Sequence, residues 1–378
     1  MANATEPEGR GLEASLTRAM ERALELAALG RGWTSPAPLS GAVVLREGES
    51  VAEGFAQDAG GRHALFHALA AAGDLARGAS LVLTTEPGGP PQAVVEAVLA
   101  ARVARVVVGA PDPNPASRGQ VLDALSRAGV RFGEAPLQQA ARRLNEAYEV
   151  FFRTRRPFVT VFSVMSLDGK TATSIGERPR APSELLDDLR ADHDAVLLGV
   201  QELVSEDVWP VTARGRGRNP LRVIVDGMAR TPLGARVLAR SGSTGMRSQT
   251  LLVTTPYAPR ERVDALREAG AEVLVLPATG DPLAVNMDLD RLLVQLGRRD
   301  VASVLLEAGG TLADAAFEAG IVDRLVVFLH PALLGGTSSP SLVGGVGHAF
   351  LESAPRLEEL EVRPVGEGLV ITGRVAKG

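Results

Sequence analysis

Two histidines are the first candidates for chemistry in this chain. The segment Gly61–Leu69 (GRHALFHAL) places His63 and His67 four residues apart, so both imidazoles lie on one face of a predicted helix. Such a pair can bind a metal ion, but nothing nearby supplies a third ligand, and the chain contains no cysteine. A thiolate-ligated zinc site is therefore impossible. We interpret both histidines as structural or surface residues.

A glycine pair in the second half of the chain is the second candidate. In the segment Glu307–Leu312 (EAGGTL), Gly309 and Gly310 follow the apolar run Val301–Leu306 and precede a predicted helix. Glycines at such a position let backbone N–H groups approach a pyrophosphate, and the N-terminus of a helix favours an anion. A glycine pair after a strand is also typical of a simple tight turn. The segment is thus a candidate phosphate-binding turn.

Further polar residues in the second half lie near the ends of predicted elements. The segment Ser166–Gly169 (SLDG) ends a predicted strand, and ligands of open α/β sheets bind beyond the carboxyl ends of strands. Guanidinium groups suit bidentate phosphate contacts, which makes Arg190 and Arg214 candidates for gripping a phosphate. The adjacent acids Glu206 and Asp207 form, by default, only a polar surface.

Helical and strand-like apolar patterns alternate along the chain, which predicts an α/β fold with parallel strands. Short turns at residues 46–48 and 366–368 predict two hairpins, one near the start of the chain and one at its end. A polar, proline-terminated joint at Arg153–Pro157 separates two predicted domains, residues 11–152 and 157–378. The predicted helices cover residues 12–29, 63–76, 91–101, 120–128, 137–152, 183–191, 260–269, 289–298 and 311–319. The predicted strands cover residues 40–45, 50–55, 80–84, 104–109, 130–132, 158–165, 195–198, 221–225, 250–253, 272–276, 301–307, 324–329, 357–363 and 369–375.

The composition excludes several classes of partner. With 45% hydrophobic and 22% charged residues, the chain has the make-up of a soluble globular protein. A net charge of −5 gives no basic footprint for nucleic acid. No apolar run approaches the length that spans a membrane, and the N-terminus lacks the pattern of a signal peptide. We expect a cytoplasmic protein with neither nucleic acid nor a membrane as partner.

Segments in both halves resemble the bifunctional deaminase/reductase family of riboflavin biosynthesis. The most specific combination is MSLDGKTA at 165–172 followed by EAGGTL at 307–312, behind a deaminase-like first half. The resemblance covers nearly the whole chain and also rests on residues 40–44, 61–69, 86–87, 105–115, 128–130, 220–226 and 321–335.

This resemblance implies both a fold and an activity. The fold is a cytidine-deaminase-like three-layer domain followed by a dihydrofolate-reductase-like domain. The family's second domain uses NADPH to reduce the ribosyl group of 5-amino-6-(5-phosphoribosylamino)uracil, a phosphorylated small molecule, to a ribityl group. Family members often form homodimers, so a homodimer is expected here. The sequence does not decide between NADPH and NADH.

The same resemblance assigns candidate site residues in the second domain. The cofactor-binding set is Ser166, Asp168, Thr171, Gly309, Gly310, Thr311 and Leu312. The substrate-binding set is Arg190, Arg214 and Glu307. Glu206 and Asp207 stand where the family has a pair of acids near the nicotinamide, and either of them, or water, would serve as the proton donor.

The first domain departs from the family where a deaminase needs its metal. A zinc-dependent nucleobase deaminase uses a His and thiolates as ligands and a Glu that moves protons. His63 is kept, but Leu65 stands in place of that Glu and Gly88 in place of a Cys, and the segment between the two family cysteines is shortened. We therefore predict an inactive deaminase domain without zinc, retained as a scaffold.

The second domain departs from the family mainly on its substrate side. Phe162 and Ala332 replace family lysines, and Arg178 and Arg180 stand where the family has Ser and Trp. Lys and Arg are not interchangeable where geometry matters. Three hypotheses stay open: an NADPH-dependent reductase of the riboflavin type, a reductase of a related heterocycle in a specialised biosynthetic pathway, and a non-catalytic paralogue. The well-kept cofactor segments favour the first two.

Overall fold

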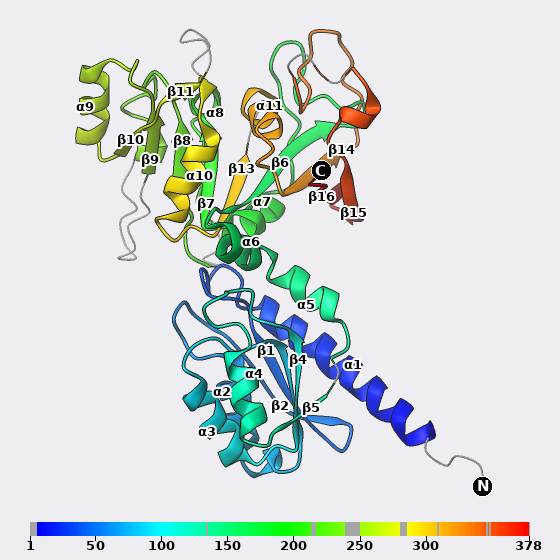
Figure 1. Cartoon of the computed structure of the whole chain (residues 1–378). Coiled ribbons are helices and arrows are strands. Elements are labelled where there is room, and N and C mark those ends of the chain that lie inside the picture. The colour runs from blue at the N-terminus through cyan, green and yellow to red at the C-terminus, as the bar shows by residue number, and fades with distance from the viewer. Residues whose placement is uncertain are drawn as a thin grey trace. The chain divides into compact units, whose positions relative to one another are not determined.

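The computed structural model describes residues 6–133, 135–212, 217–238, 250–279, 286–307, 310–344, 347 and 349–377; its side chains begin at residue 11 and omit Glu206, Thr279 and Asn286. The chain divides into two compact units, Met1–Arg155 and Arg156–Gly378. A large β-sheet forms the centre of each unit (Figure 1). Within the described ranges, no helix is both long enough and apolar enough to cross a membrane.

The sheet of the first unit combines antiparallel and parallel pairing in the order β2-β1-β3-β4-β5. β1 pairs antiparallel with β2 and β3, whereas β3, β4 and β5 run parallel. A tight turn with positive φ at Glu47 and Gly48 joins β1 to β2, which confirms the predicted hairpin, and β3 to β5 confirm the predicted parallel arrangement. The strands are β1 (Gly41–Arg46), β2 (Glu49–Phe55), β3 (Ser80–Thr85), β4 (Arg105–Ala110) and β5 (Arg131–Gly133).

Helices cover both faces of this sheet and make three layers. Because side chains alternate along a strand, Val82 of β3 packs with α1 on one face, and its neighbours Leu81 and Leu83 pack with α2 and α3 on the other. A single helix was predicted over 137–152, but the structure has two. The helices are α1 (Glu6–Ala28), α2 (Ala64–Ala72), the short 3₁₀ helix η1 (Gly73–Ala76), α3 (Pro91–Ala101), α4 (Gln120–Arg127), α5 (Gln138–Leu144) and α6 (Glu146–Thr154).

Asn145 explains the break between α5 and α6. Its side-chain oxygen accepts from the Leu39 backbone N–H at 2.7 Å, and its side-chain nitrogen donates to the Leu39 carbonyl at 2.8 Å. A side chain that satisfies a distant backbone in this way competes with a continuous helix. The contact ties the end of the unit to the chain just before β1.

The larger sheet of the second unit has the order β10-β9-β8-β7-β13-β6-β14-β16-β15. The strands from β10 to β14 run parallel, and the terminal hairpin of β16 and β15 adds two antiparallel strands, as the sequence predicted for this hairpin. The strands are β6 (Phe158–Ser166), β7 (Ala195–Gly199), β8 (Leu221–Val225), β9 (Thr250–Thr254), β10 (Glu272–Val275), β13 (Ser303–Glu307), β14 (Arg324–His330), β15 (Leu357–Val365) and β16 (Gly368–Val375).

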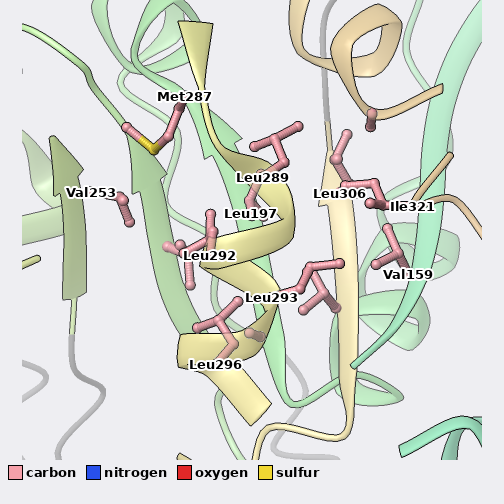
Figure 2. Close-up of a cluster of buried hydrophobic side chains, with 14 of the residues drawn as sticks. Val159, Leu197, Val253, Met287, Leu289, Leu292, Leu293, Leu296, Leu306 and Ile321 are labelled. Atoms are coloured by element: carbon pink, nitrogen blue, oxygen red, sulfur yellow. The ribbon is translucent and has the colours of Figure 1, made fainter. Parts of the chain in front are cut away.

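Two hydrophobic clusters lie on the two faces of this sheet. Leu292, Leu293 and Leu296 of α10 pack on one face, against Leu197 and Leu306 among others (Figure 2). Residues of α7, α8 and α9 pack on the other face. The remaining elements are α7 (Ser183–Ala191), α8 (Val200–Glu206), η2 (Arg236–Leu238), α9 (Arg260–Glu268), the small hairpin β11 (Ala278–Thr279) and β12 (Asn286–Met287), α10 (Leu289–Gly297), α11 (Gly310–Glu318) and η3 (Leu351–Ser353).

A buried carboxylate fastens the two ends of the second unit together. Asp323 Oδ1 lies 2.8 Å from Arg156 Nη2 and 2.7 Å from Lys377 Nζ, and Oδ2 accepts from Arg156 Nη1 and from the Val159 backbone N–H, both at 2.9 Å. The Asp323 side chain is only 4% exposed. A bidentate, buried pair of this kind is costly to break, because the cations lose a partner they share.

We expect Asp323→Ala to lower the free energy of unfolding of the second unit by about 3 kcal/mol, since it breaks a buried, doubly hydrogen-bonded pair. The chain has two tryptophans, Trp33 in the first unit and Trp209 in the second, so a Trp33→Phe background reports on the second unit by fluorescence during urea unfolding. Asp264→Ala, which removes an exposed ion pair with Arg267, is the control and should change stability by less than about 0.5 kcal/mol. Equal losses in the two variants would contradict this role for Asp323.

Candidate functional site

The central strands of the second sheet direct several predicted site residues to one edge. β7, β13 and β6 are parallel neighbours, so their carboxyl ends, at Gly199, Glu307 and Ser166, lie on the same side of the sheet. Ligands of open α/β sheets bind at such an edge. α11 begins directly beyond β13, at Gly310. The segments SLDG and EAGGTL are far apart in the sequence, but both begin at the carboxyl ends of strands at this edge of the sheet.

The first turn of α11 presents backbone groups that suit an anion. The leading N–H groups of a helix have no partner within the helix, and Thr311 is exposed. The chain packs closely at Gly310, where an added Cβ would lie 3.0 Å from the carbonyl oxygen of Ser341. Leu312 reaches the end of β7, 3.8 Å from the place of a Cβ on Gly199. This turn has the polar backbone groups that a phosphate requires.

Asp168 joins the loop after β6 to the loop after β14. Its Oδ1 accepts from the Ser166 hydroxyl at 2.6 Å and from the Leu334 backbone N–H at 3.0 Å, and its Oδ2 accepts from the Gly335 backbone N–H at 2.7 Å. Thr171 adds two contacts, from its backbone N–H and its hydroxyl, to the Pro340 carbonyl at 2.9 and 3.3 Å. These three predicted cofactor residues thus lie together, with their polar atoms holding one loop to another.

These hydrogen bonds also set the charge of Asp168. The Ser166 hydroxyl, followed by the Leu334 and Gly335 amides, lowers the pKa of Asp168 to about 2. Because the pKa of Asp168 is depressed in the folded protein, the charged carboxylate contributes fully to stability above its ordinary pKa of 3.8. This contribution to stability is lost only as the pH falls towards 2. We call the hydrogen bonds of Asp168 to Ser166, Leu334 and Gly335 the Asp168 clamp. The Asp168 clamp is therefore insensitive to pH across the neutral range.

Arg190 and Glu307, both predicted to bind substrate, are paired with each other. Arg190 Nε donates to Glu307 Oε1 at 2.6 Å, and Nη2 donates to Oε2 at 2.7 Å. The side chains are 9% and 11% exposed. Two parallel bonds of this type form the strongest and most directional pairing available to a guanidinium. The contacts of either residue with a substrate stay predictions.

The segment after α8 is held by an aromatic ring that the sequence analysis did not single out. Two guanidinium groups pack on the Trp209 ring, with Arg222 Cζ 4.9 Å and Arg236 Cζ 5.8 Å from the ring centroid. Burial lowers the pKa of Arg222 to about 10. Asp207 Oδ1 accepts from the Arg236 backbone N–H at 2.9 Å. The sequence feature that could have pointed to this contact is the tryptophan itself, because the chain has only two of them.

Other predicted residues contribute less to the described geometry. Arg214, Gly309 and the side chain of Glu206 lie outside the described residues. Arg178 and Arg180 are exposed. Phe162, which stands where the resemblance places a lysine, is buried, with 5% of its surface exposed. It is the residue of β6 that pairs in register with Glu307 of β13.

His63 caps a helix in the first unit. His63 precedes α2, and its Nδ1 accepts from the Leu65 backbone N–H at 3.2 Å. Burial, with a smaller contribution from His67 and an opposing one from the Thr85 backbone, lowers the pKa of His63 to about 4. The ring is therefore neutral at pH 7, and because Nδ1 accepts a hydrogen bond, the proton lies on Nε2.

This arrangement does not fit a zinc ion. The lone pair of His63 Nδ1, which is the nitrogen free to bind a metal in this tautomer, is used by the helix cap. Leu65 is fully buried, and a Cβ added at Gly88 would have Asp112 Oδ2, at 3.6 Å, as its nearest neighbour. Among the described residues, no three His, Asp or Glu side chains are grouped so that they could hold a metal ion.

A buried network next to this cap was not predicted. The Asp112 carboxylate accepts from the Tyr148 hydroxyl at 2.9 Å and the Ser117 hydroxyl at 2.6 Å, and Glu86 Oε2 accepts from the Asp112 backbone N–H at 3.0 Å. Burial raises the pKa of Tyr148, as does the charge of Asp112. The network orders the turn at residues 112–115 (DPNP), beyond the carboxyl end of β4.

Comparisons with known proteins agree over nearly the whole chain. The RibD C-terminal domain family model matches residues 157–371. The riboflavin biosynthesis protein RibD of Escherichia coli (strain K12) is 33% identical over 368 residues, 92% of this chain and 96% of that one, and RibD of Actinobacillus pleuropneumoniae is 30% identical over 359 residues, 93% of each. The solved structure of Acinetobacter baumannii RibD, form 1, aligns with a TM-score of 0.81 at 27% identity, covering 96% of this chain and 99% of that one.

A further solved structure carries a name that describes two activities. The diaminohydroxyphosphoribosylaminopyrimidine deaminase/5-amino-6-(5-phosphoribosylamino)uracil reductase of Thermotoga maritima has a TM-score of 0.76 at 25% identity and covers 96% of this chain and 99% of that one. These likenesses confirm the predicted fold class, a deaminase-like domain followed by a dihydrofolate-reductase-like domain.

To test the Asp168 clamp, we expect Asp168→Ala to speed backbone hydrogen exchange in residues 331–335 at pH 7 on the order of tenfold. The reason is that the Leu334 and Gly335 amides lose their hydrogen-bond acceptor. Exchange would be measured by mass spectrometry on the full chain. Glu177→Ala, which removes an exposed carboxylate from the same loop, is the matched control and should leave the exchange unchanged. Unaltered exchange in Asp168→Ala would show that the clamp is not formed in solution.

Proposed function

The chain belongs to the RibD family of riboflavin biosynthesis proteins, and we propose that it acts as an NADPH-dependent reductase of 5-amino-6-(5-phosphoribosylamino)uracil whose first domain does not deaminate. The observation that carries the reductase half is the shared sheet edge, where the first turn of α11, with Thr311 exposed, lies beside the ends of β7 and β13. The observation that carries the deaminase half is the occupied, neutral imidazole of His63 in a chain without cysteine.

In the reductase domain, α11 would hold the cofactor. The backbone of Gly310, Thr311 and Leu312 would receive phosphate groups at the positive end of the helix, which favours an anion there. When bound, NADPH supplies the hydride that converts a ribosyl group to a ribityl group. The Asp168 clamp would keep the loop after β6 in place at the same edge. Glu307 would orient the substrate, and Glu206, Asp207 or water would supply the proton.

A second candidate is a reductase of a related heterocycle in a specialised biosynthetic pathway. Phe162 favours it, because this ring stands beside Glu307 where the resemblance places a lysine. An apolar ring cannot donate a hydrogen bond to the ribose or phosphate of a substrate. A substrate with no hydrogen-bonding group next to Phe162 would fit this edge of the sheet better.

Calorimetry with NADPH and NADH, followed by NADPH oxidation with the aminouracil substrate, tests the reductase. We expect NADPH to bind and turn over, and Gly310→Val to weaken binding about tenfold, or about 1.4 kcal/mol, because its Cβ would crowd the Ser341 carbonyl. Gly234→Val is the control, since an added Cβ there meets nothing within 4 Å. Binding without turnover would favour the second candidate. No binding of either nucleotide would overturn both.

For the first domain, we expect the purified protein to hold less than about 0.1 zinc per chain by mass spectrometry after exposure to zinc, since a single imidazole does not retain the metal. We also expect no ammonia release from the diaminopyrimidine substrate. His63→Asn is the matched control, because Asn also caps a helix but offers no imidazole. One zinc per chain in the unmodified protein, lost in His63→Asn, would contradict an inactive deaminase domain.

A further inference from the structure

We propose that His330 is a ligand-contacting residue of the reductase domain, which donates a hydrogen bond from its Nε2–H to a carbonyl oxygen of a bound ligand. Two ligands carry such an oxygen: the cofactor, in its nicotinamide carboxamide, and the aminouracil substrate, in its pyrimidine ring. The proposal rests on the proposed reductase function and adds a contact from β14, a strand from which no site residue was predicted.

His330 lies at the same edge of the sheet as the predicted site residues. It is the last residue of β14, which runs parallel to β6 on the side away from β13 (Figure 1). It pairs in register with Ser166, the last residue of β6. Both residues therefore lie at the carboxyl ends of neighbouring parallel strands, where ligands of open α/β sheets bind.

The side chain of His330 lies on the face of the sheet that α7 covers. Phe328, two residues earlier in β14, belongs to the hydrophobic cluster on that face, and side chains alternate along a strand. The same alternation from Leu305 of β13 places Glu307 on this face, in agreement with its ion pair to Arg190 of α7. His330 and Glu307 therefore face the same side of the sheet, with β6 between their strands.

The imidazole of His330 is not satisfied by the protein itself. Its Nδ1 is buried and has no hydrogen-bond partner within the part of the chain that the structure describes. The side chain as a whole is half-buried, and Nε2 is not among the buried atoms that lack a partner. In the neutral ring one nitrogen carries the proton, and a proton on Nδ1 would be a buried donor without an acceptor. We therefore expect the proton on Nε2, the nitrogen that a ligand can reach.

The position of His330 favours a carbonyl oxygen over a phosphate as its partner. α11, whose first turn suits an anion, begins beyond β13, and β6 separates β13 from β14. Adjacent strands are about 4.8 Å apart, so β13 and β14 are about 10 Å apart. A ligand whose phosphate groups lie at α11 therefore reaches His330 with its ring system. One neutral N–H also suits a neutral carbonyl, whereas a phosphate is better met by a cation or by several donors.

Substitutions that move or remove the donor test this proposal by calorimetry. Glutamine places an amide N–H near the position of Nε2, asparagine places it near Nδ1, and leucine has no donor. We expect His330→Leu and His330→Asn to weaken binding of one ligand about tenfold, and His330→Gln to stay within about threefold of the unmodified protein. His67→Leu, the same change in the first unit, is the matched control and should alter neither affinity.

Two titrations distinguish the sources of the carbonyl oxygen. NADPH alone reports on the carboxamide, and the aminouracil substrate added with NADP⁺, which cannot donate a hydride, reports on the pyrimidine. A loss confined to the first titration assigns the contact to the cofactor, and a loss confined to the second assigns it to the substrate. Unchanged affinities for both ligands in His330→Leu would overturn the proposal.

Nitrogen-15 NMR of the ring reads the tautomer without turnover. The chain has five histidines, so the signals missing in His330→Gln identify this ring. We expect the proton on Nε2 in the free protein, and a proton on Nδ1 would overturn the proposal. Normal binding and the expected tautomer without NADPH oxidation would instead be a failure of the proposed reductase function alone. An unmodified protein that binds neither ligand would overturn both.

Discussion

The insertion of β13 between β7 and β6 is the constraint on which the candidate site depends. Val304, Leu305 and Leu306 are all at most 1% exposed, because both faces of this strand are covered by hydrophobic clusters. Parallel pairing on both sides fixes its register. A shift of one residue would turn Leu305 and Leu306 to the wrong faces and would move Glu307 out of reach of Arg190. The position of the site residues is thus a consequence of core packing.

Buried charges in the second unit are tolerated because each has specific partners. Glu307 has its guanidinium fork, Asp323 has two cations and a backbone N–H, and Arg222 has the Trp209 ring and a hydrogen bond to Thr250 at 2.9 Å. Desolvation makes such groups unfavourable when alone, so each arrangement is strongly specified. Asp168 differs, because it is exposed and joins two loops. The sheet is therefore specified by buried contacts, whereas the loops at the candidate site are held by contacts open to water.

The sequence was sufficient to predict the elements that depend on local periodicity. Most strands of the second sheet and the terminal hairpin follow from short apolar runs between turns, and the first turn of α11 follows from its glycines. The partners of the polar residues could not be predicted in this way. Asn145 and Leu39 are 106 residues apart, and Arg190 and Glu307 are 117 apart, so no local pattern connects them. The short helix α8 was missed because it lies in a segment taken for a polar loop.

The first unit packs closely around Leu65 and Gly88, the two positions where the resemblance places a Glu and a Cys. A Glu at position 65 without a metal nearby would be a buried, unpaired charge, whereas Leu65 joins the cluster beneath α2 at no such cost. A glycine at position 88 leaves no thiolate beside the Asp112 carboxylate, where two negative charges would repel. His63 keeps a structural task as the cap of α2. Leu65 and Gly88 are therefore both compatible with the packing of the three layers, and neither places a charge in this part of the first unit.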